Sequence, residues 1–252
     1  MSIKSKIKVL LNIKIAGIPW FLHDYREFIK QMKNHKVEFS MKLYPILTDK
    51  YKESGMAKGH YFYQDLIIAQ RIFENQPLKH VDVGSRIDGF VAHVASYREI
   101  EIFDIRPLQA NIKNIKFIQA DLMNFTNNEF YNYTYSISAL HSIEHFGLGR
   151  YGDPIDFDGH LKGLNSIYKI LKKGGKFYFS VPIGPQRVEF NAHRVFNLTY
   201  LLSLFKDKYS IDSFSFVDDK GELNYDVALT DNLVNNNCYC NYGCGIFEMT
   251  KL

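Results

Sequence analysis

The fold is decided by the stretch His80-Val-Asp-Val-Gly-Ser-Arg-Ile-Asp-Gly-Phe-Val-Ala-His93. A short β-branched run leads through Asp82 to Gly84, and after a turn Gly89 precedes an apolar stretch with helical spacing. This order predicts a strand, a tight loop and the start of a helix, the place where α/β sheets hold nucleotide-like ligands. A glycine-rich turn after a strand also occurs without any ligand. The stretch therefore predicts an α/β sheet with a candidate binding site at its edge.

The acid before the first glycine narrows the choice of ligand. The spacing G-x-x-x-x-G differs from the dinucleotide pattern G-x-G-x-x-G and lacks the Lys-Ser/Thr that completes a P-loop. The carboxylate of Asp82 would repel the pyrophosphate of a dinucleotide, whereas it would attract an ammonium group. The methionine end of S-adenosylmethionine carries such a group, so the sequence favours this ligand over a dinucleotide.

Two further predicted strands end in acids. Residues 99–106 form a strand that ends near Asp104, about 20 residues after the first glycine, where a carboxylate that binds ribose hydroxyls is expected. Residues 115–120 form the next strand and lead into Asp121 and Leu122, an acid for the adenine amino group and an apolar cover for its ring. The three acids predict sites for the ammonium, ribose and adenine of one ligand. The alternative is that each acid only caps a turn.

These residues resemble the class I S-adenosylmethionine-dependent methyltransferases. More narrowly, the chain resembles a bacterial family of unknown function that is often associated with surface-polysaccharide gene clusters. The narrower resemblance covers about residues 57–250 and rests on HYFYQD (60–65), HVDVGSRIDG (80–89), HSIEHFGLGRYGD (141–153), VEFNAHR (188–194) and GCGIFE (243–248). The glycine loop departs from the broad pattern, because residues 85–88 stand where small residues are usual.

The resemblance implies a Rossmann-like three-layer α/β sandwich with a seven-stranded, mostly parallel sheet, an antiparallel last strand and a helical N-terminal extension. We expect residues 1–56 to form an accessory cap and residues 57–252 to form the cofactor-binding domain. The implied cofactor residues are Tyr63, Gln64, Asp82, Gly84, Ser85, Asp104, Ile105, Asp121, Leu122 and Ala139.

A mainly helical pattern is predicted from Pro19 to about Asn75. Its last helix carries an apolar face formed by Leu66, Ile67, Ala69, Ile72 and Phe73, and Gln76-Pro77 ends it. In class I methyltransferases a helix at this position covers the methionine end of the cofactor. By this resemblance His60 joins Tyr63 and Gln64 as a lid candidate, whereas we expect Tyr61 and Phe62 to belong to the core.

A polar cluster follows the fourth predicted strand, residues 133–140, and contains His141, Glu144, His145, Arg150, Asp153, Asp156, Asp158 and His160. Ligands of open α/β sheets bind beyond the carboxyl ends of the strands, so the acceptor of a methyl group is expected here. Transfer to a hydroxyl needs alignment and removal of the hydroxyl proton. We predict that His145 is the base, that Glu144 orients it and that His141 is the second candidate. Alternatively, a strand-end histidine caps the backbone.

A second polar loop follows the fifth predicted strand, residues 176–182. Its side chains, together with Arg150 and Asp153, are predicted to bind a phosphate or sugar of the acceptor, and they are Arg187, Asn191, His193 and Arg194. The alternative is a loop tied by salt bridges to the acids around 153–158.

The remaining pattern completes the fold. An amphipathic helix with Leu161, Leu164, Tyr168 and Leu171 is predicted to stop at Gly174-Gly175. Asn197 is predicted to cap a helix that runs to Phe205, and two strands follow at 210–217 and 242–249. The Asn-rich residues 232–241 are interpreted as a loop or an insertion near the site.

Composition limits the partners and the compartment. The 252 residues carry a net charge of +4 without a long basic run, so no nucleic-acid partner is predicted. Lys4, Lys6 and Lys8 precede an apolar run that Asn12 and Lys14 break, so we predict neither a signal peptide nor a spanning helix. Contact of this segment with a membrane surface stays an alternative.

The three cysteines, Cys238, Cys240 and Cys244, indicate a reducing cytoplasm because their number is odd. Their C-x-C-x-x-x-C spacing lacks paired C-x-x-C knuckles, so we read them as small strand residues and assign no metal. A divalent metal among the His, Glu and Asp side chains is an alternative that we do not favour.

The sequence therefore predicts a cytoplasmic S-adenosylmethionine-dependent methyltransferase that releases S-adenosylhomocysteine. Its predicted acceptor is a hydroxyl of a sugar, sugar nucleotide or surface-glycan intermediate, an assignment that rests on the family resemblance. Two alternatives remain open: a nucleotide-sugar or NAD-dependent enzyme, and a non-catalytic module with the same fold. The oligomeric state is not predicted.

Overall fold

The computed structural model describes residues 16–33 and 39–252 and divides the chain into two units, residues 1–56 and 57–252. In the first unit, helix α2 spans Ile18–Met32 and starts with Pro19 in its first turn, where a missing N–H costs nothing. Residues 39–56 form neither helix nor strand, so the mainly helical pattern predicted from Pro19 to about Asn75 is confirmed only for α2 and for α3, which spans His60–Asn75. The predictions about Lys4, Lys6 and Lys8 lie outside the described residues.

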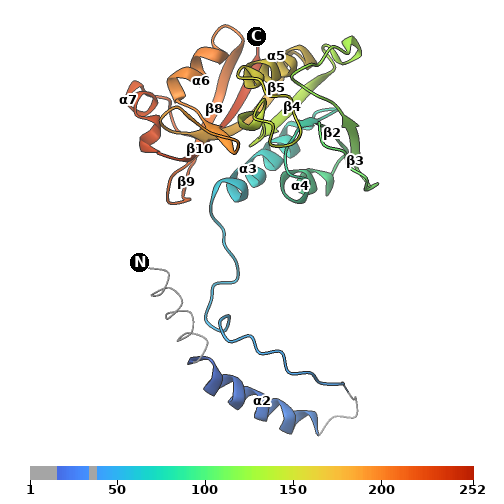
Figure 1. The fold of residues 1–252 in the computed structure, drawn as a ribbon, viewed down its shortest axis with the longest axis vertical. Coiled ribbons are helices and arrows are strands. Elements are labelled where there is room, and N and C mark those ends of the chain that lie inside the picture. The colour runs from blue at the N-terminus through green and yellow to red at the C-terminus, as the bar shows by residue number, and fades with distance from the viewer. Residues whose placement is uncertain (1–15, 34–38) are drawn as a thin grey trace. The chain divides into compact units, whose positions relative to one another are not determined.

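The second unit is built on one sheet of eight strands (Figure 1), in the order β3-β2-β1-β4-β5-β10-β8-β9. The strands are β1 (Val81–Val83), β2 (Ile100–Asp104), β3 (Ile115–Gln119), β4 (Thr134–Leu140), β5 (Leu171–Ile183), β8 (Tyr209–Val217), β9 (Leu223–Asn224) and β10 (Gly243–Lys251). Strands β3, β2, β1, β4 and β5 pair in parallel, whereas β10 is antiparallel to both β5 and β8. The eighth strand beyond the predicted seven is the two-residue β9, antiparallel to β8.

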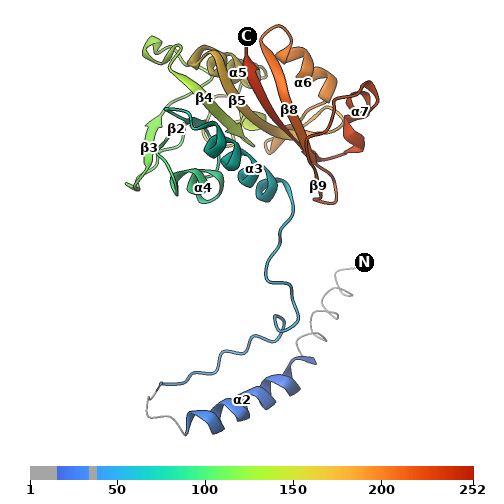
Figure 2. The same cartoon turned by 180° about the vertical axis from the view of Figure 1, so that it is seen from behind.

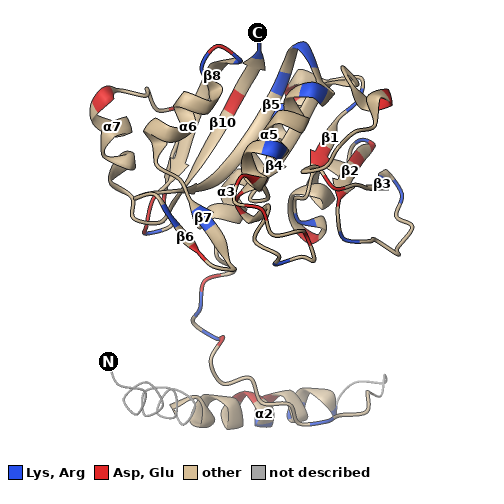
Figure 3. Ribbon diagram, turned by 45° about the horizontal axis from the view of Figure 1, so that its top comes forward, with Lys and Arg blue, Asp and Glu red and all other residues tan. Residues whose placement is uncertain are grey.

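Helices cover both faces of this sheet, which makes the predicted three layers (Figure 2). Helices α3 (His60–Asn75) and α4 (Ala92–Ala95) cover one face, and α5 (Gly159–Ile170) and α6 (Leu198–Phe205) cover the other. Each face has its own apolar cluster, with Phe90 and Ile102 in the first and Phe177 and Phe247 in the second. Burial of these large side chains stabilises the sandwich. Both charge signs are interspersed along the elements of this unit (Figure 3).

The helix ends show which local signals decided them. Helix α3 ends at Asn75 because Gln76 adopts φ +45° directly before Pro77. Its buried apolar residues are Ile68, Ala69 and Ile72, while Leu66 and Phe73 are exposed, so the predicted apolar face is rotated. The predicted cap of α6 is confirmed, since the Asn197 side chain accepts a hydrogen bond from the backbone N–H of Tyr200.

Two predicted boundaries are wrong: the end of the helix at Gly174-Gly175 and the start of the fifth strand at residue 176. Helix α5 ends at Ile170, because Leu171 already pairs with Thr134 in the sheet. Gly174 and Gly175 therefore lie in a bulge of β5, and the φ of +77° at Gly174 makes this bulge possible.

The Asn-rich segment, read as a loop, contains the short helix α7 (Asp231–Asn235), which is capped by the Thr230 side chain, and a helical turn at Asn237–Tyr239. Between β5 and α6 lies a hairpin of strands β6 (Arg187–Glu189) and β7 (His193–Val195). Shorter turns are found at Ile87–Val91, Asn128–Phe130 and Ile143–His145.

Candidate active site

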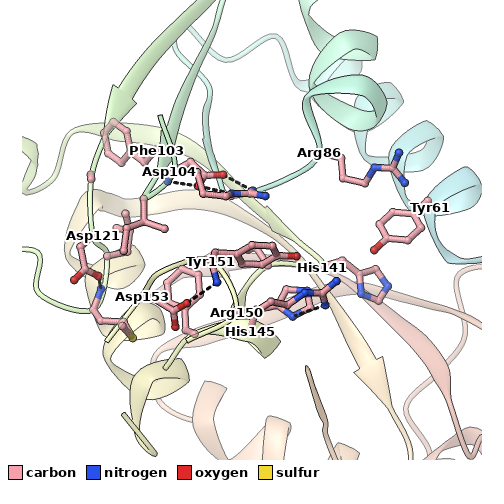
Figure 4. Close-up of a pocket in the computed structure, with 18 residues that line it drawn as sticks. Tyr61, Arg86, Phe103, Asp104, Asp121, His141, His145, Arg150, Tyr151 and Asp153 are labelled. Carbon is pink, nitrogen blue, oxygen red and sulfur yellow. Dashed lines mark hydrogen bonds and ion pairs between the residues drawn. The ribbon is translucent and has the colours of Figure 1, made fainter. Parts of the chain in front are cut away.

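A cavity of about 280 Å³ lies at the carboxyl ends of β1, β2, β3 and β4 (Figure 4). This is the edge at which open α/β sheets bind their ligands. The predicted site residues that line it are Gly84, Asp104, Ile105, Asp121, Leu122, His141, His145, Arg150 and Asp153. The structure thus brings together residues that three strand ends and the loop after β4 supply.

Gly84 forms the floor of the cavity next to β1. Its φ is +68°, and its N–H donates to the carbonyl of Phe103 at 3.0 Å. A Cβ on this residue would lie 3.1 Å from the Cβ of Ser142, closer than most real contacts. Both the backbone angle and the close approach therefore require glycine here.

Asp82 and Ser85 lie behind the cavity wall and do not line it. The Asp82 carboxylate accepts hydrogen bonds from the Ser85 N–H at 2.9 Å, the Ser85 hydroxyl at 2.6 Å and the Ser138 hydroxyl at 2.6 Å. Burial raises the pKa of Asp82 to about 6, against the effect of these donors. Asp82 thus stabilises the glycine loop through hydrogen bonds. This corrects the expected direct contact between Asp82 and an ammonium group.

Asp104 faces the cavity but is paired with a neighbouring arginine. The Arg106 guanidinium donates to both carboxylate oxygens, at 3.0 and 2.6 Å, and the Arg106 N–H adds a bond of 2.8 Å. The same guanidinium lies 4.3 Å from the centre of the Tyr151 ring. Ribose hydroxyls would therefore have to replace Arg106 at this carboxylate.

Asp121 both lines the cavity and caps a turn. Its carboxylate accepts from the Met123 N–H at 2.8 Å and from the Asn124 side chain at 2.7 Å. The neighbouring Leu122 is 3% exposed and also lines the cavity. The two readings of this acid, turn cap and ligand residue, are thus compatible with one geometry.

His145 is held in the form that a general base needs. Its Nδ1 lies 2.7 Å from the carbonyl oxygen of Ala192, which can only accept, so Nδ1 carries the proton. Arg150 donates to the same carbonyl at 3.0 Å, and its 3.5 Å approach to Nδ1 is a contact between two donors. Burial lowers the pKa of His145, and the neutral ring then has its lone pair at Nε2.

Glu144 forms its hydrogen bond with His141 and not with His145. Its carboxylate oxygen Oε1 lies 2.6 Å from His141 Nδ1 but 3.8 Å from His145 Nε2. Glu144 therefore orients His141 rather than His145, which corrects our expectation. Burial acts to lower the pKa of His141, but the facing Cys244 and the Glu144 carboxylate raise it well above its usual value. His141 also adopts φ +48°, a conformation uncommon outside glycine.

The loop from His145 to Asp153 is organised by Asp153. Its carboxylate accepts from the N–H groups of Gly147 at 2.8 Å, Gly149 at 3.1 Å and Tyr151 at 3.1 Å. The Tyr151 ring lines the cavity, with its centre 4.3 Å from the Arg106 guanidinium and 5.1 Å from that of Arg150. Asp153 thus shapes the cavity wall from within the loop.

The predicted substrate residues of the second loop lie elsewhere. Arg194 is buried and donates to the backbone carbonyls of Glu144 at 3.3 Å, Phe146 at 2.5 Å, Asp156 at 3.4 Å and Phe157 at 3.1 Å. Its guanidinium ties this loop down through carbonyls rather than through the acids, so the expected substrate contact is wrong for Arg194.

The other three residues of the hairpin do not line the cavity either. Arg187 binds Glu189 at 2.8 Å and the carbonyl of Asn241 at 2.9 Å. His193 lies 3.3 Å from Glu189, and Asn191 is exposed at the hairpin turn. Ala192, between them, contributes the carbonyl that fixes His145.

Three other predicted cofactor residues, two of them on α3, do not line the cavity. Tyr63 donates to the carbonyl of Ala57, Gln64 is buried and accepts from Ser180, and Ala139 lies within β4, so none of the three lines the cavity. Tyr61, expected in the core, is 43% exposed and lines the cavity instead, and Phe62 is 41% exposed.

Several cavity residues were not predicted, among them Arg86, Arg106 and Tyr151. Each of the two arginines lies two positions from an acid, Arg86 from Asp88 and Arg106 from Asp104, and this spacing is the sequence signal that could have identified them.

Three solved structures have a similar fold. The N1-methyltransferase of 1,6-didemethyltoxoflavin from Burkholderia thailandensis, with that molecule and S-adenosylhomocysteine bound, is 13% identical over 77% of this chain and 79% of its own, with a TM-score of 0.55. The N-methyltransferase NodS of Bradyrhizobium japonicum WM9, in complex with S-adenosylhomocysteine, is 9% identical over 77% and 88%, with a TM-score of 0.50. The cyclase SpnF is 14% identical over 75% and 80%, with a TM-score of 0.52. The predicted class I methyltransferase fold is thereby confirmed.

No curated protein matches the chain. One family model does, described as "Caenorhabditis protein of unknown function, DUF268", and it matches residues 94–239. This region is more than half of the chain and includes the strand ends of β2, β3 and β4 with the two histidines of the cavity. The chain therefore belongs to the DUF268 family.

Proposed function

We propose that the chain is an S-adenosylmethionine-dependent methyltransferase that uses His145 as the general base toward a hydroxyl acceptor. One observation carries the proposal: Gly84, Asp104, Asp121 and the two histidines, which lie on the four segments that follow β1, β2, β3 and β4, line a single cavity. S-adenosylhomocysteine is bound in two proteins of the same fold, described above. The fold alone does not decide the reaction, since SpnF is named a cyclase.

The residues present fit this cofactor. Gly84 leaves room beside Ser142 that a side chain would fill. Asp104 would receive the ribose hydroxyls, and Asp121 with Leu122 would receive the adenine. When bound, S-adenosylmethionine supplies an electrophilic methyl group on a sulfonium. The cavity volume of about 280 Å³ is close to the lower limit of about 300 Å³ that is typical of small-molecule sites.

Nε2 of His145 would take the proton that the acceptor hydroxyl loses. Because Ala192 holds the proton on Nδ1, the neutral His145 ring accepts the acceptor's proton at Nε2. Arg150, beside it, would hold an oxygen of the acceptor or a phosphate attached to it. We propose the hydroxyl of a sugar, sugar nucleotide or glycan intermediate as the acceptor. This choice of class rests on the resemblance of residues 57–250 to a family associated with surface polysaccharides.

Calorimetric titration of S-adenosylhomocysteine into wild type and the Asp104→Ala variant tests the cofactor site. We expect a one-to-one complex in the wild type. The variant should bind about 5- to 150-fold more weakly, because a charge-assisted pair to the ribose is worth about 1–3 kcal/mol.

Asp212→Ala is the matched control, since Asp212 is a carboxylate on β8 that pairs with Lys176 of β5 outside the cavity. Its affinity should equal that of the wild type. If the wild type fails to bind S-adenosylhomocysteine, the proposal is wrong. If it binds but transfers no methyl group to any of a panel of sugar nucleotides, sugars and small-molecule hydroxyls and amines, the chain is a binding module of this fold.

A further inference from the structure

Three side chains from distant parts of the chain meet beside the cavity. They are His60 at the start of α3, His141 directly after β4, and Cys244 in β10. One donor atom of each, a ring nitrogen or the sulfur, lies within 4.8 Å of the other two. The rings of His60 and His141 are parallel within 6°, with centres 5.2 Å apart. Cys244 is fully buried, and His141 also lines the cavity.

Within the described part of the chain, one of these donor atoms has no hydrogen-bond partner and another has only long hydrogen bonds. The His141 side chain is 4% exposed, and its Nδ1 is taken by Glu144, but its Nε2 is buried without a hydrogen bond. The sulfur of Cys244 has only long contacts, 3.8 Å to Gln64 Oε1 and 3.8 Å to the carbonyl of Gly245. Buried polar atoms normally have partners, so the unpaired Nε2 of His141 indicates a missing ligand.

We propose that His60, His141 and Cys244 bind a zinc ion. Imidazole and thiolate are the ligands that Zn²⁺ prefers. In a tetrahedral site with bonds of about 2.0–2.3 Å the donor atoms lie roughly 3.3–3.8 Å apart, so the cluster needs to close by about 1 Å. On binding, the Cys244 thiol releases its proton to solvent, and the thiolate offsets one of the two metal charges.

The surroundings of the cluster support this assignment. Glu144 bonds Nδ1 of His141, the carboxylate–histidine arrangement that orients histidine ligands and leaves Nε2 for the metal. A rival reading is a nucleophilic Cys244 activated by His141 and Glu144. It fails because Cys244 is 0% exposed and cannot reach a substrate. A metal bound to His141 needs no such access.

Three protein ligands leave one position free, as in catalytic rather than structural zinc sites. Water would take the fourth position. Cys238 and Cys240 are not part of the cluster that the described residues form. This inference goes beyond the proposed methyl transfer and does not depend on it.

The test uses the full chain without a polyhistidine tag. Zinc content is measured by mass spectrometry, and Co²⁺ is titrated into the metal-free protein while absorption is recorded. We expect one equivalent of metal and a thiolate-to-cobalt charge-transfer band in the near ultraviolet. Cys244→Ser should lose the band, and His60→Asn, a change at the edge of α3 that does not threaten the core, should lose stoichiometric binding.

Glu144→Gln should weaken the affinity for metal about 10- to 100-fold. The Cys238→Ser and Cys240→Ser variants are the matched controls and should keep the band. Absence of stoichiometric metal in the wild type would overturn the proposal, and so would a band that Cys244→Ser leaves unchanged. Titration of S-adenosylhomocysteine into the same samples separates this outcome from a failure of the methyltransferase proposal.

Discussion

The two sides of the cavity are built in different ways. On the cofactor side, the two acids that line the cavity are held by neighbours two or three positions away, Asp104 by Arg106 and Asp121 by Met123 and Asn124. On the acceptor side, the decisive contacts join residues far apart in sequence. The carbonyl of Ala192 fixes His145, 47 positions earlier, and Arg194 reaches the carbonyls of Glu144 and Phe157.

The difference has a functional meaning. Short-range contacts hold the two acids of the cofactor side that line the cavity. The acceptor side depends on the hairpin of β6 and β7 packing against the loop after β4, so it can vary in shape while the cofactor side stays constant. Changes on the acceptor side should therefore affect turnover and stability, and changes on the cofactor side should affect cofactor affinity.

The largest effect is expected from His145→Asn on the acceptor side. With any acceptor that supports turnover, the rate of methyl transfer should fall about 10²- to 10⁴-fold, the usual contribution of a general base. The affinity for S-adenosylhomocysteine, measured by calorimetry, should stay within twofold. An equal loss of cofactor affinity would contradict the assignment of cofactor binding to one side of the cavity and turnover to the other.

The pH dependence of turnover is a second test of His145 as the general base. Because burial lowers the pKa of His145, the neutral base persists as the pH falls, and the rate should decline only below its usual value of 6.5. A rate that falls already above pH 6.5 would assign the limiting proton transfer to another group.

The next effect is on stability. Arg194→Met keeps the length of the side chain but leaves four backbone carbonyls without their charged donor. We expect the free energy of unfolding, from urea titration, to fall by about 2–4 kcal/mol. Arg187→Met, on the outer part of the same hairpin, should cost less than about 1 kcal/mol. Equal losses in the two variants would contradict the special position of Arg194.

Asp82→Asn tests the hydrogen bonds by which Asp82 holds the glycine loop. Burial raises the folded-state pKa of Asp82 from 3.8 to about 6. The protonated carboxyl therefore contributes stability that is fully present below pH 3.8 and is lost as the pH rises to about 6, on the order of 3 kcal/mol in total. Unfolding measured between pH 4 and 6 should lose this component of its pH dependence in the variant. An unchanged slope would mean that Asp82 titrates normally.

The smallest effect is expected from Gly84→Ala. The left-handed backbone and the 3.1 Å approach to Ser142 should cost about 1–2 kcal/mol of stability. Affinity for S-adenosylhomocysteine should fall as well, because the methyl group narrows the cavity. Gly55→Ala, where nothing lies within 4 Å of the added Cβ, is the control and should be neutral for both.

The sequence allowed the cofactor side to be predicted because its signals are local. The strand that ends at Asp104, the turn at Asp121 and the glycine at position 84 are each defined within a few residues. The order of these segments was sufficient to predict a parallel sheet with all three at one edge. The cap of α6 by Asn197 was predictable for the same reason.

The acceptor side could not be predicted in the same detail. Nothing in the stretch 187–194 indicates that Arg194 faces carbonyls instead of a ligand, because those carbonyls belong to a loop some 40 residues away. The pairing of Glu144 with His141 depends on the turn at Ile143–His145, which a polar sequence does not specify. Cys244 likewise met its two histidines only through the placement of β10 beside β5.

The brace beneath the glycine loop extends further than Asp82. His80 contacts the hydroxyl of Ser138 at 3.0 Å, Ser138 and Ser85 both donate to Asp82, and the N–H of Leu140 donates to Ser85 at 3.1 Å. This continuous hydrogen-bonded chain links the ends of β1 and β4. The amide protons of Ser85 and Leu140 should therefore exchange with deuterated solvent at one common, slow rate, since neither can open without the other. The glycine loop thus behaves as a rigid part of the sheet rather than as a flexible flap.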